Sequence, residues 1–294
     1  MPTITPHLWF DKEAKEAAEF YVATFPDSRI KSVRTITGTP SGDCDVVLFD
    51  LFDRPFQAIS AGPTFKFTPA ISFFITCSTK EEVQEYFAAL SDGGMVLVPL
   101  DAYPFSDLFG WCQDRYGLSW QVGYAGNREI NQRITPTLMF TKDVCGRAEE
   151  AMRFYTEVFD NSAVGEIQHY GPGEEPDREG TLKYGPFTLD GQHFAAMDSA
   201  QAHEFTFNEA ISLIVECDGQ EQIDTYWNTL SADPSAEECG WLKDKFGVSW
   251  QILPTRLDEM MHDGSQEQLD RVTQAFLQMK KFDLAELEKA YEGS

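Results

Sequence analysis

Apolar and polar residues alternate along the chain in four similar blocks. Each block opens with a short strand-like run and continues with apolar residues at helical spacing. In the first block the strand pattern covers 8–10, and the helical face consists of Ala14, Ala17, Ala18, Tyr21 and Phe25. Several short strand-like runs, separated by Gly and Pro, follow each helix. The pattern therefore predicts a β-α-β-β-β unit that occurs four times.

Capping residues indicate where the later helices begin. Ser78 with Glu81 forms a capping-box pattern, and Asp218 with Glu221 precedes the matching helix in the second half of the chain. The helical faces that follow are apolar: Val83, Tyr86, Phe87 and Leu90 in one, and Ile223, Tyr226, Trp227 and Leu230 in the other.

Two further helices are predicted near the C-terminus, and they fall outside the four blocks. Ser265 with Gln268 begins the first, and Asp283 with Glu286 begins the second. Their apolar stripes are Leu269, Val272, Phe276 and Met279 in one, and Leu284, Leu287 and Tyr291 in the other. We expect these stripes to pack across the two halves of the chain, with a dimer contact as the alternative.

The four blocks form two copies of one larger unit. Short motifs recur in the same order at an offset of 130 to 140 residues, such as Ile4-Thr5-Pro6 with Ile134-Thr135-Pro136, and Ser119-Trp120-Gln121 with Ser249-Trp250-Gln251. This spacing is too long for a solenoid repeat and indicates a tandem duplication. We predict domains at 1–126 and 133–256, a polar linker between them, and a helical extension at 264–294.

Composition and charge limit the classes of partner. The chain has 294 residues, of which 48 are acidic and 23 basic, so its net charge of −25 repels nucleic acid and anionic membrane surfaces. Its six cysteines are scattered, and the first residues lack the basic and apolar regions of a secretory leader. We therefore expect a cytoplasmic protein with reduced thiols and a small-molecule ligand.

Several motifs resemble one known family. They are Ile4-Thr5-Pro6-His7-Leu8-Trp9-Phe10, Phe20-Tyr21 with Phe25-Pro26-Asp27-Ser28, Phe207-Asn208-Glu209-Ala210-Ile211-Ser212, and the run from Gly240 to Gln251. They are similar to PhnB-like proteins, a branch of the vicinal-oxygen-chelate superfamily that includes glyoxalases and bleomycin and fosfomycin resistance proteins. The resemblance implies an α+β fold in which two β-α-β-β-β modules of each domain form a cupped mixed sheet with helices outside. Members of this branch often carry the label "3-demethylubiquinone-9 3-methyltransferase", but the sequence shows no Gly-rich strand-to-helix loop for a methionine-derived cofactor.

The resemblance also implies where a divalent metal would bind. Superfamily enzymes use a His on one module, a His or Glu on the other, and a Glu on a closing strand. Strand alternation places His7 and Gln121 inside the first cup, but 68–74 contains no His, Glu or Asp. One imidazole and one amide make a weak ligand set, so we predict no metal, with His7 and Gln121 as the only weak candidates.

These positions leave several functions open. The sequence predicts a metal-free cup that binds a small apolar or aromatic molecule, with these pocket candidates: His7, Trp9, Gln121, Trp111, Thr137, Met139, Gln251 and Trp241. The first copy retains His7 and Trp9, so its cup is the expected binding site. The alternatives are a metal-dependent lyase, isomerase or dioxygenase, and a scaffold copy that completes an intramolecular pseudo-dimer; a further homodimer is also possible.

Overall fold

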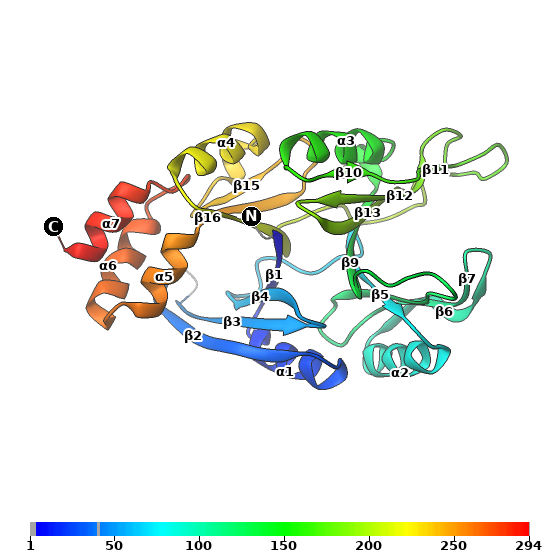
Figure 1. Cartoon of the computed structure of the whole chain (residues 1–294), viewed down its shortest axis with the longest axis horizontal. Helices are drawn as coiled ribbons and strands as arrows, with labels where there is room; N and C mark the ends of the chain where they lie inside the picture. The colour runs from blue at the N-terminus through cyan, green and yellow to red at the C-terminus, as the bar shows by residue number, and fades with distance from the viewer. Residues whose placement is uncertain (1–3, 40–41, 294) are drawn as a thin grey trace.

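The computed structural model describes residues 4–39 and 42–293 and shows four modules followed by a helical tail (Figure 1). The first module comprises β1 (Ile4–Phe10), α1 (Ala14–Thr24), β2 (Arg29–Thr39), β3 (Gly42–Leu51) and β4 (Arg54–Ser60). The second comprises β5 (Ile71–Cys77), α2 (Lys80–Ser91), β6 (Met95–Tyr103), β7 (Ser106–Gln113) and β8 (Ser119–Tyr124). The predicted α+β class and tandem organisation are confirmed.

The second copy keeps this plan with local changes. Its first module comprises β9 (Ile134–Phe140), a 3-10 turn (Lys142–Val144), α3 (Ala148–Val158), β10 (Ala163–Val164), β11 (Gln168–His169), β12 (Leu182–Leu189) and β13 (Gln192–Asp198). Its second comprises β14 (Ile211–Cys217), α4 (Gln220–Leu230), a 3-10 turn (Pro234–Ala236), β15 (Trp241–Lys243) and β16 (Ser249–Pro254). In the described residues the last module thus has three strands, one fewer than predicted.

Each of the two sheets takes one module from each copy. The seven-stranded sheet has the order β15-β16-β14-β1-β4-β3-β2, and the nine-stranded sheet has β10-β12-β13-β9-β5-β8-β7-β6, with β11 paired to β12. The copies join through antiparallel pairs, β1 with β14 and β5 with β9. The expectation that the two modules of one domain form one sheet is therefore wrong. The alternation of apolar residues sets which face of a strand is buried, but not which edge strand becomes its neighbour.

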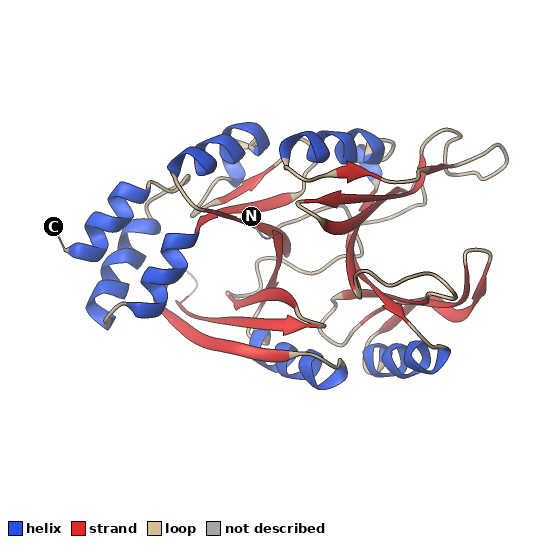
Figure 2. Ribbon diagram, in the orientation of Figure 1, coloured by secondary structure: helices blue, strands red, loops and turns tan. Residues whose placement is uncertain are grey.

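Helices α1 to α4 cover the outer faces of the sheets, and the inner faces point away from them (Figure 2). The helical faces predicted from spacing are buried, including Tyr21 against Phe49 and Trp120. Buried aromatic rings of this kind bring a large apolar area out of water and fix each helix on its sheet.

The predicted helix starts are one residue early at two sites. Thr79, rather than Ser78, caps α2 by accepting a hydrogen bond from the Glu82 amide, while Ser78 bonds to the Glu82 carboxylate. Gly219, rather than Asp218, precedes α4, and the Asp218 amide donates to the side-chain oxygen of Gln222 in the first turn of the helix.

The C-terminal tail contains three helices, α5 (Thr255–Asp263), α6 (Gln266–Phe276) and α7 (Leu284–Glu292). The capping box of Ser265 and the cap of Asp283 are confirmed. Helix α5 was not predicted, because it follows β16 directly and has no capping side chain at its start. The apolar stripes pack on one another around Met260, Val272, Phe282 and Leu287 and reach Leu253 of β16.

Candidate functional site

The inner face of the seven-stranded sheet carries a row of polar side chains across its strands. Register places Ser249, Ser212 and His7 side by side on β16, β14 and β1, and Gln57 next to His7 on β4. Residues that neighbour each other in register share a face of the sheet. We call this surface the His7 cup; its matching surface on the nine-stranded sheet is the Thr137 cup.

His7 forms the floor of its cup and is fully buried. Its Nδ1 lies 3.4 Å from the Ser212 hydroxyl, which accepts a 2.8 Å hydrogen bond from the amide of Gln251. The other ring nitrogen, Nε2, is buried and has no hydrogen-bond partner among the described residues. Burial lowers the pKa of His7 to about 3, so the imidazole is neutral at physiological pH.

The contacts of Ser212 determine which tautomer of His7 this arrangement favours. A serine hydroxyl has one hydrogen and two lone pairs. Ser212 accepts from Gln251, and among the described residues Nδ1 of His7 is the acceptor within reach of the Ser212 hydrogen, which favours donation from Ser212 to Nδ1. The Nε2 atom then carries the ring proton and is a hydrogen-bond donor without an acceptor.

Aromatic rings surround the exposed side of the His7 cup. Trp241 meets His7 edge-on at 5.4 Å between ring centroids, and Trp9 lies 6.4 Å from Trp241 and 5.1 Å from Phe65. The Trp9 indole is fixed by a 2.8 Å bond to the Gly62 carbonyl. Within the described part of the chain, Trp241 has no side-chain hydrogen bond, and the buried hydroxyl of nearby Ser249 has no partner.

The Thr137 cup has the same plan, but its polar groups are satisfied. Gln121 donates a 2.8 Å hydrogen bond to Ser72, as Gln251 does to Ser212. Trp111 donates a 2.8 Å hydrogen bond to Ser119. Buried residues Thr137 and Met139 occupy the positions that His7 and Trp9 have in the other cup.

The eight pocket candidates therefore divide between the sheets in an unexpected way. His7, Trp9, Trp241 and Gln251 gather in the His7 cup, and the other four candidates gather in the Thr137 cup: Gln121, Trp111, Thr137 and Met139. The expectation that His7 and Gln121 share one site is wrong, because β1 and β8 belong to different sheets.

The residues of the His7 cup do not fit a tightly bound divalent metal. The described residues contain no group of three or more His, Cys, Asp or Glu side chains that could hold one. Glu209, the nearest carboxylate expected from the sequence, is bound by Lys243 at 2.7 Å. The remaining neighbours of His7 are neutral hydroxyl and amide groups, which are weak ligands for a divalent ion.

A pair of buried carboxylates organises the two cores and was not predicted from the sequence. Asp114 is buried and accepts hydrogen bonds from the Tyr21 hydroxyl at 2.7 Å and the Trp120 indole at 2.8 Å. It also accepts from two backbone amides, and Asp244 makes the same four kinds of contact. The signal was present, because Asp114 and Asp244 occupy matching positions of the repeat. Both are only 3% exposed and each accepts four hydrogen bonds from the protein, so we assign them a structural role.

None of the helices in the described residues has the length and apolar character that crossing a membrane requires.

All six cysteines are free thiols. Burial raises the pKa of Cys77 and Cys217 to about 12, which makes both poor nucleophiles.

Comparison with known proteins assigns the chain to a family. The family model described as 3-demethylubiquinone-9 3-methyltransferase matches residues 2–123 and again 132–253. A putative 3-demethylubiquinone-9 3-methyltransferase, the PhnB protein from Bacillus cereus, is 38% identical over 42% of this chain and 99% of its own, with a TM-score of 0.40. Glyoxalase I from Zea mays is 10% identical over 89% of this chain and 97% of its own; its TM-score of 0.56 reflects a shared fold. The curated proteins gave no match. The chain therefore belongs to the family described as 3-demethylubiquinone-9 3-methyltransferase and carries the family domain twice.

Proposed function

We propose that this protein binds a small aromatic molecule bearing a hydrogen-bond acceptor in the His7 cup. The observation that carries the proposal is the pair of buried polar atoms without partners, Nε2 of His7 and Oγ of Ser249. Each such atom costs about 1–3 kcal/mol when it is left unsatisfied. A ligand that accepts from Nε2 and contacts the serine hydroxyl would recover much of that cost.

The rings around His7 favour an aromatic ligand. Trp9 and Trp241 are partly exposed, so their faces can contact a bound ring as well as each other. Trp241 lies directly against His7 and has no hydrogen bond to hold it in the part of the chain described. In our proposal its indole turns outward, and the ligand ring takes its place beside the imidazole.

The Thr137 cup is the scaffold half of the molecule in this proposal. Its Trp111 and Gln121 are held by Ser119 and Ser72, and the position of His7 is occupied by Thr137. A ligand entering this cup would have to break internal hydrogen bonds before it could form its own. That difference supports a single binding site for each chain.

Methyl transfer, which the family description suggests, is not supported by the strand-to-helix turns. A methionine-derived cofactor is commonly held by a Gly-rich turn after a strand. Here the four turns are residues 11–13, 78–79, 141–147 and 218–219, and none contains more than one glycine. The residues present do not fit that cofactor, and we derive no step through it.

We propose that this binding protein is cytoplasmic. Its free thiols support this proposal, since an oxidising compartment favours disulfides. Association into a homodimer stays a prediction.

A matched pair of variants tests the proposed site. We would screen aromatic metabolites and antibiotics by thermal shift and confirm the complexes by native mass spectrometry. Compounds that stabilise the wild type should also stabilise Thr137→Val but should lose at least about tenfold in affinity for His7→Leu, since the unpaired ring nitrogen belongs to His7 and not to Thr137. Retention of full affinity by His7→Leu, or equal losses in both variants, would show that the His7 cup is not the site.

A further inference from the structure

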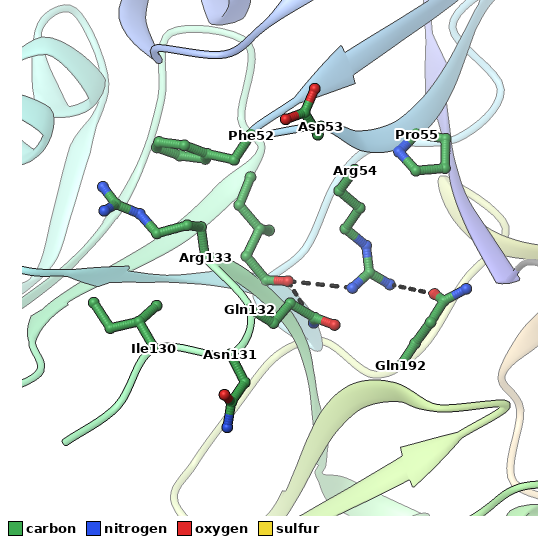
Figure 3. A pocket seen from close by; sticks show the side chains of 10 residues that line it. Phe52, Asp53, Arg54, Pro55, Ile130, Asn131, Gln132, Arg133 and Gln192 are labelled. Atoms are coloured by element: carbon green, nitrogen blue, oxygen red, sulfur yellow. Dashed lines mark hydrogen bonds between the residues drawn. The ribbon is translucent and has the colours of Figure 1, made fainter.

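A cavity of about 350 Å³ lies where the two sheets meet, and it shares no lining residue with the His7 cup. Its walls come from the β3–β4 turn, from the linker before β9, and from Gln192 at the start of β13 (Figure 3). Phe52, Pro55 and Ile130 give it an apolar side, and Arg54 and Arg133 give it two guanidinium groups. A cavity of this size can hold a small organic molecule.

Arg54 has no acidic partner among the described residues. Its guanidinium donates to the backbone carbonyl of Ile134 at 3.2 Å and to the side-chain oxygen of Gln192 at 3.1 Å, and both acceptors are neutral. Its Nε is buried and finds no hydrogen-bond partner within residues 4–39 and 42–293. Burial lowers the pKa of Arg54 to about 9, so the group keeps its charge at neutral pH and is poorly solvated.

The other charges in the cavity are already compensated. Arg133 donates to Glu82 at 3.2 Å and lies over the ring of Phe52 at 4.6 Å, although its Nε is also buried without a partner. Asp53 is exposed and pairs with Arg29 at 3.7 Å. The cavity therefore holds one positive charge without a counter-ion, in a chain with a net charge of −25.

The duplication produces this charge only once. Arg54 opens β4, and Gln192 opens the matching strand β13, so these residues occupy equivalent places in the two copies. They meet across the junction between the sheets and hydrogen-bond to each other. If the second copy had a carboxylate at this place, the guanidinium would be neutralised internally; it has an amide instead.

We infer that this cavity binds a small organic monocarboxylate, with its carboxylate at the Arg54 guanidinium and its apolar part against Phe52, Pro55 and Ile130. A carboxylate can accept two hydrogen bonds from the N–H groups of a guanidinium, and its single negative charge would neutralise the positive charge of Arg54. A phosphate dianion would leave an excess negative charge, and an inorganic anion would leave the apolar wall uncovered.

Benzoate and its neutral isostere benzamide are the probes for this inference. We expect saturable benzoate binding to the wild type by calorimetry, with shifts of the backbone amide signals of residues 52–54 and 130–134. Benzamide should bind at least about tenfold more weakly, because it lacks the charge that Arg54 requires. Equal binding of the two probes, or no saturable benzoate binding, would overturn the inference.

The decisive variant is Gln192→Glu. It keeps the shape of the side chain and supplies a carboxylate where the amide oxygen already accepts from Arg54, so the fold should be retained and benzoate binding should fall at least about tenfold. Arg128→Gln is the control, since in the described part of the chain Arg128 donates to backbone carbonyls outside the cavity; this variant should bind benzoate as the wild type does. Unchanged benzoate affinity in Gln192→Glu would contradict the site. Tighter binding of inorganic phosphate than of benzoate at this site would overturn the assignment to a carboxylate.

Discussion

Gln251 donates a 2.8 Å hydrogen bond to the hydroxyl group of Ser212, and this contact joins β16 to β14 beneath the His7 cup. Gln121 makes the same bond, of the same length, to Ser72 in the other sheet. The duplication has therefore preserved the floor of both inner faces. The two cups differ in the aromatic side chains around this floor, because Trp111 bonds to Ser119 whereas Trp241 lies against His7.

The tryptophans of the two cups should contribute unequally to stability. Trp111→Phe removes the bond to Ser119 and leaves a buried hydroxyl without a partner, which should lower the free energy of unfolding by about 1–2 kcal/mol beyond the loss of packing. Trp241→Phe has no such bond to lose and should cost less. Urea denaturation of the two variants measures the difference, and equal losses would show that the hydrogen bond makes no net contribution.

Asp114 and Asp244 should each be essential for stability. An asparagine in either place keeps the shape but replaces one acceptor oxygen with an N–H donor group, facing donors that already point inward. We expect Asp114→Asn and Asp244→Asn each to lower the free energy of unfolding by roughly 2–4 kcal/mol. Asp92→Asn is the control, because its ion pair with Arg115 is exposed and should be worth less than about 1 kcal/mol. A loss as small as that of the control would mean that the buried contacts are weak.

The sequence predicts which face of a strand or helix is buried better than it predicts which strands pair with each other. Alternation along β8 correctly separated the buried Trp120 from Gln121 on the inner face, because the side chains of a strand alternate by geometry. The pairing of β1 with β14 could not be predicted in this way. Backbone hydrogen bonds between edge strands do not depend on side chains, and the two copies offer nearly equivalent edges.

This limit also explains the error in the candidate site. His7 and Gln121 belong to one copy, so the sequence favoured them as neighbours, whereas Gln251 of the other copy lies beside His7. The unpaired charge of Arg54 was equally inaccessible to sequence reasoning. Its two acceptors, the Ile134 carbonyl and the Gln192 side chain, are neutral, and they meet Arg54 only because the two sheets join at this place.

The melting temperature should not depend on a divalent metal. The donors around His7 are neutral side chains, and Glu209 is paired with Lys243. We expect treatment with a chelator, followed by addition of Zn, Ni, Mn or Fe(II), to leave the melting temperature unchanged. A rise with one equivalent of metal, absent from His7→Leu, would demonstrate a metal site that the donor set does not suggest.

Acid should destabilise the protein in part through His7. Its pKa is about 3 in the folded protein and near 6.5 in an unfolded chain, so the unfolded state binds more protons between these values. Its contribution to stability is therefore complete above about pH 6.5 and declines as pH falls toward 3, by up to about 1.4 kcal/mol per pH unit. The His7→Leu variant lacks the titrating group, so its free energy of unfolding should fall less steeply over this range.

Urea denaturation at a series of pH values between about 4 and 7 measures this slope, provided that the transition stays two-state. Thr137→Val is the control, since it alters the equivalent position of the other cup and removes no titrating group, so it should keep the slope of the wild type. If His7→Leu and the wild type lose stability in parallel, the imidazole must be hydrated or paired in solution. Its Nε2 would then not be the unsatisfied donor on which ligand binding in the His7 cup depends.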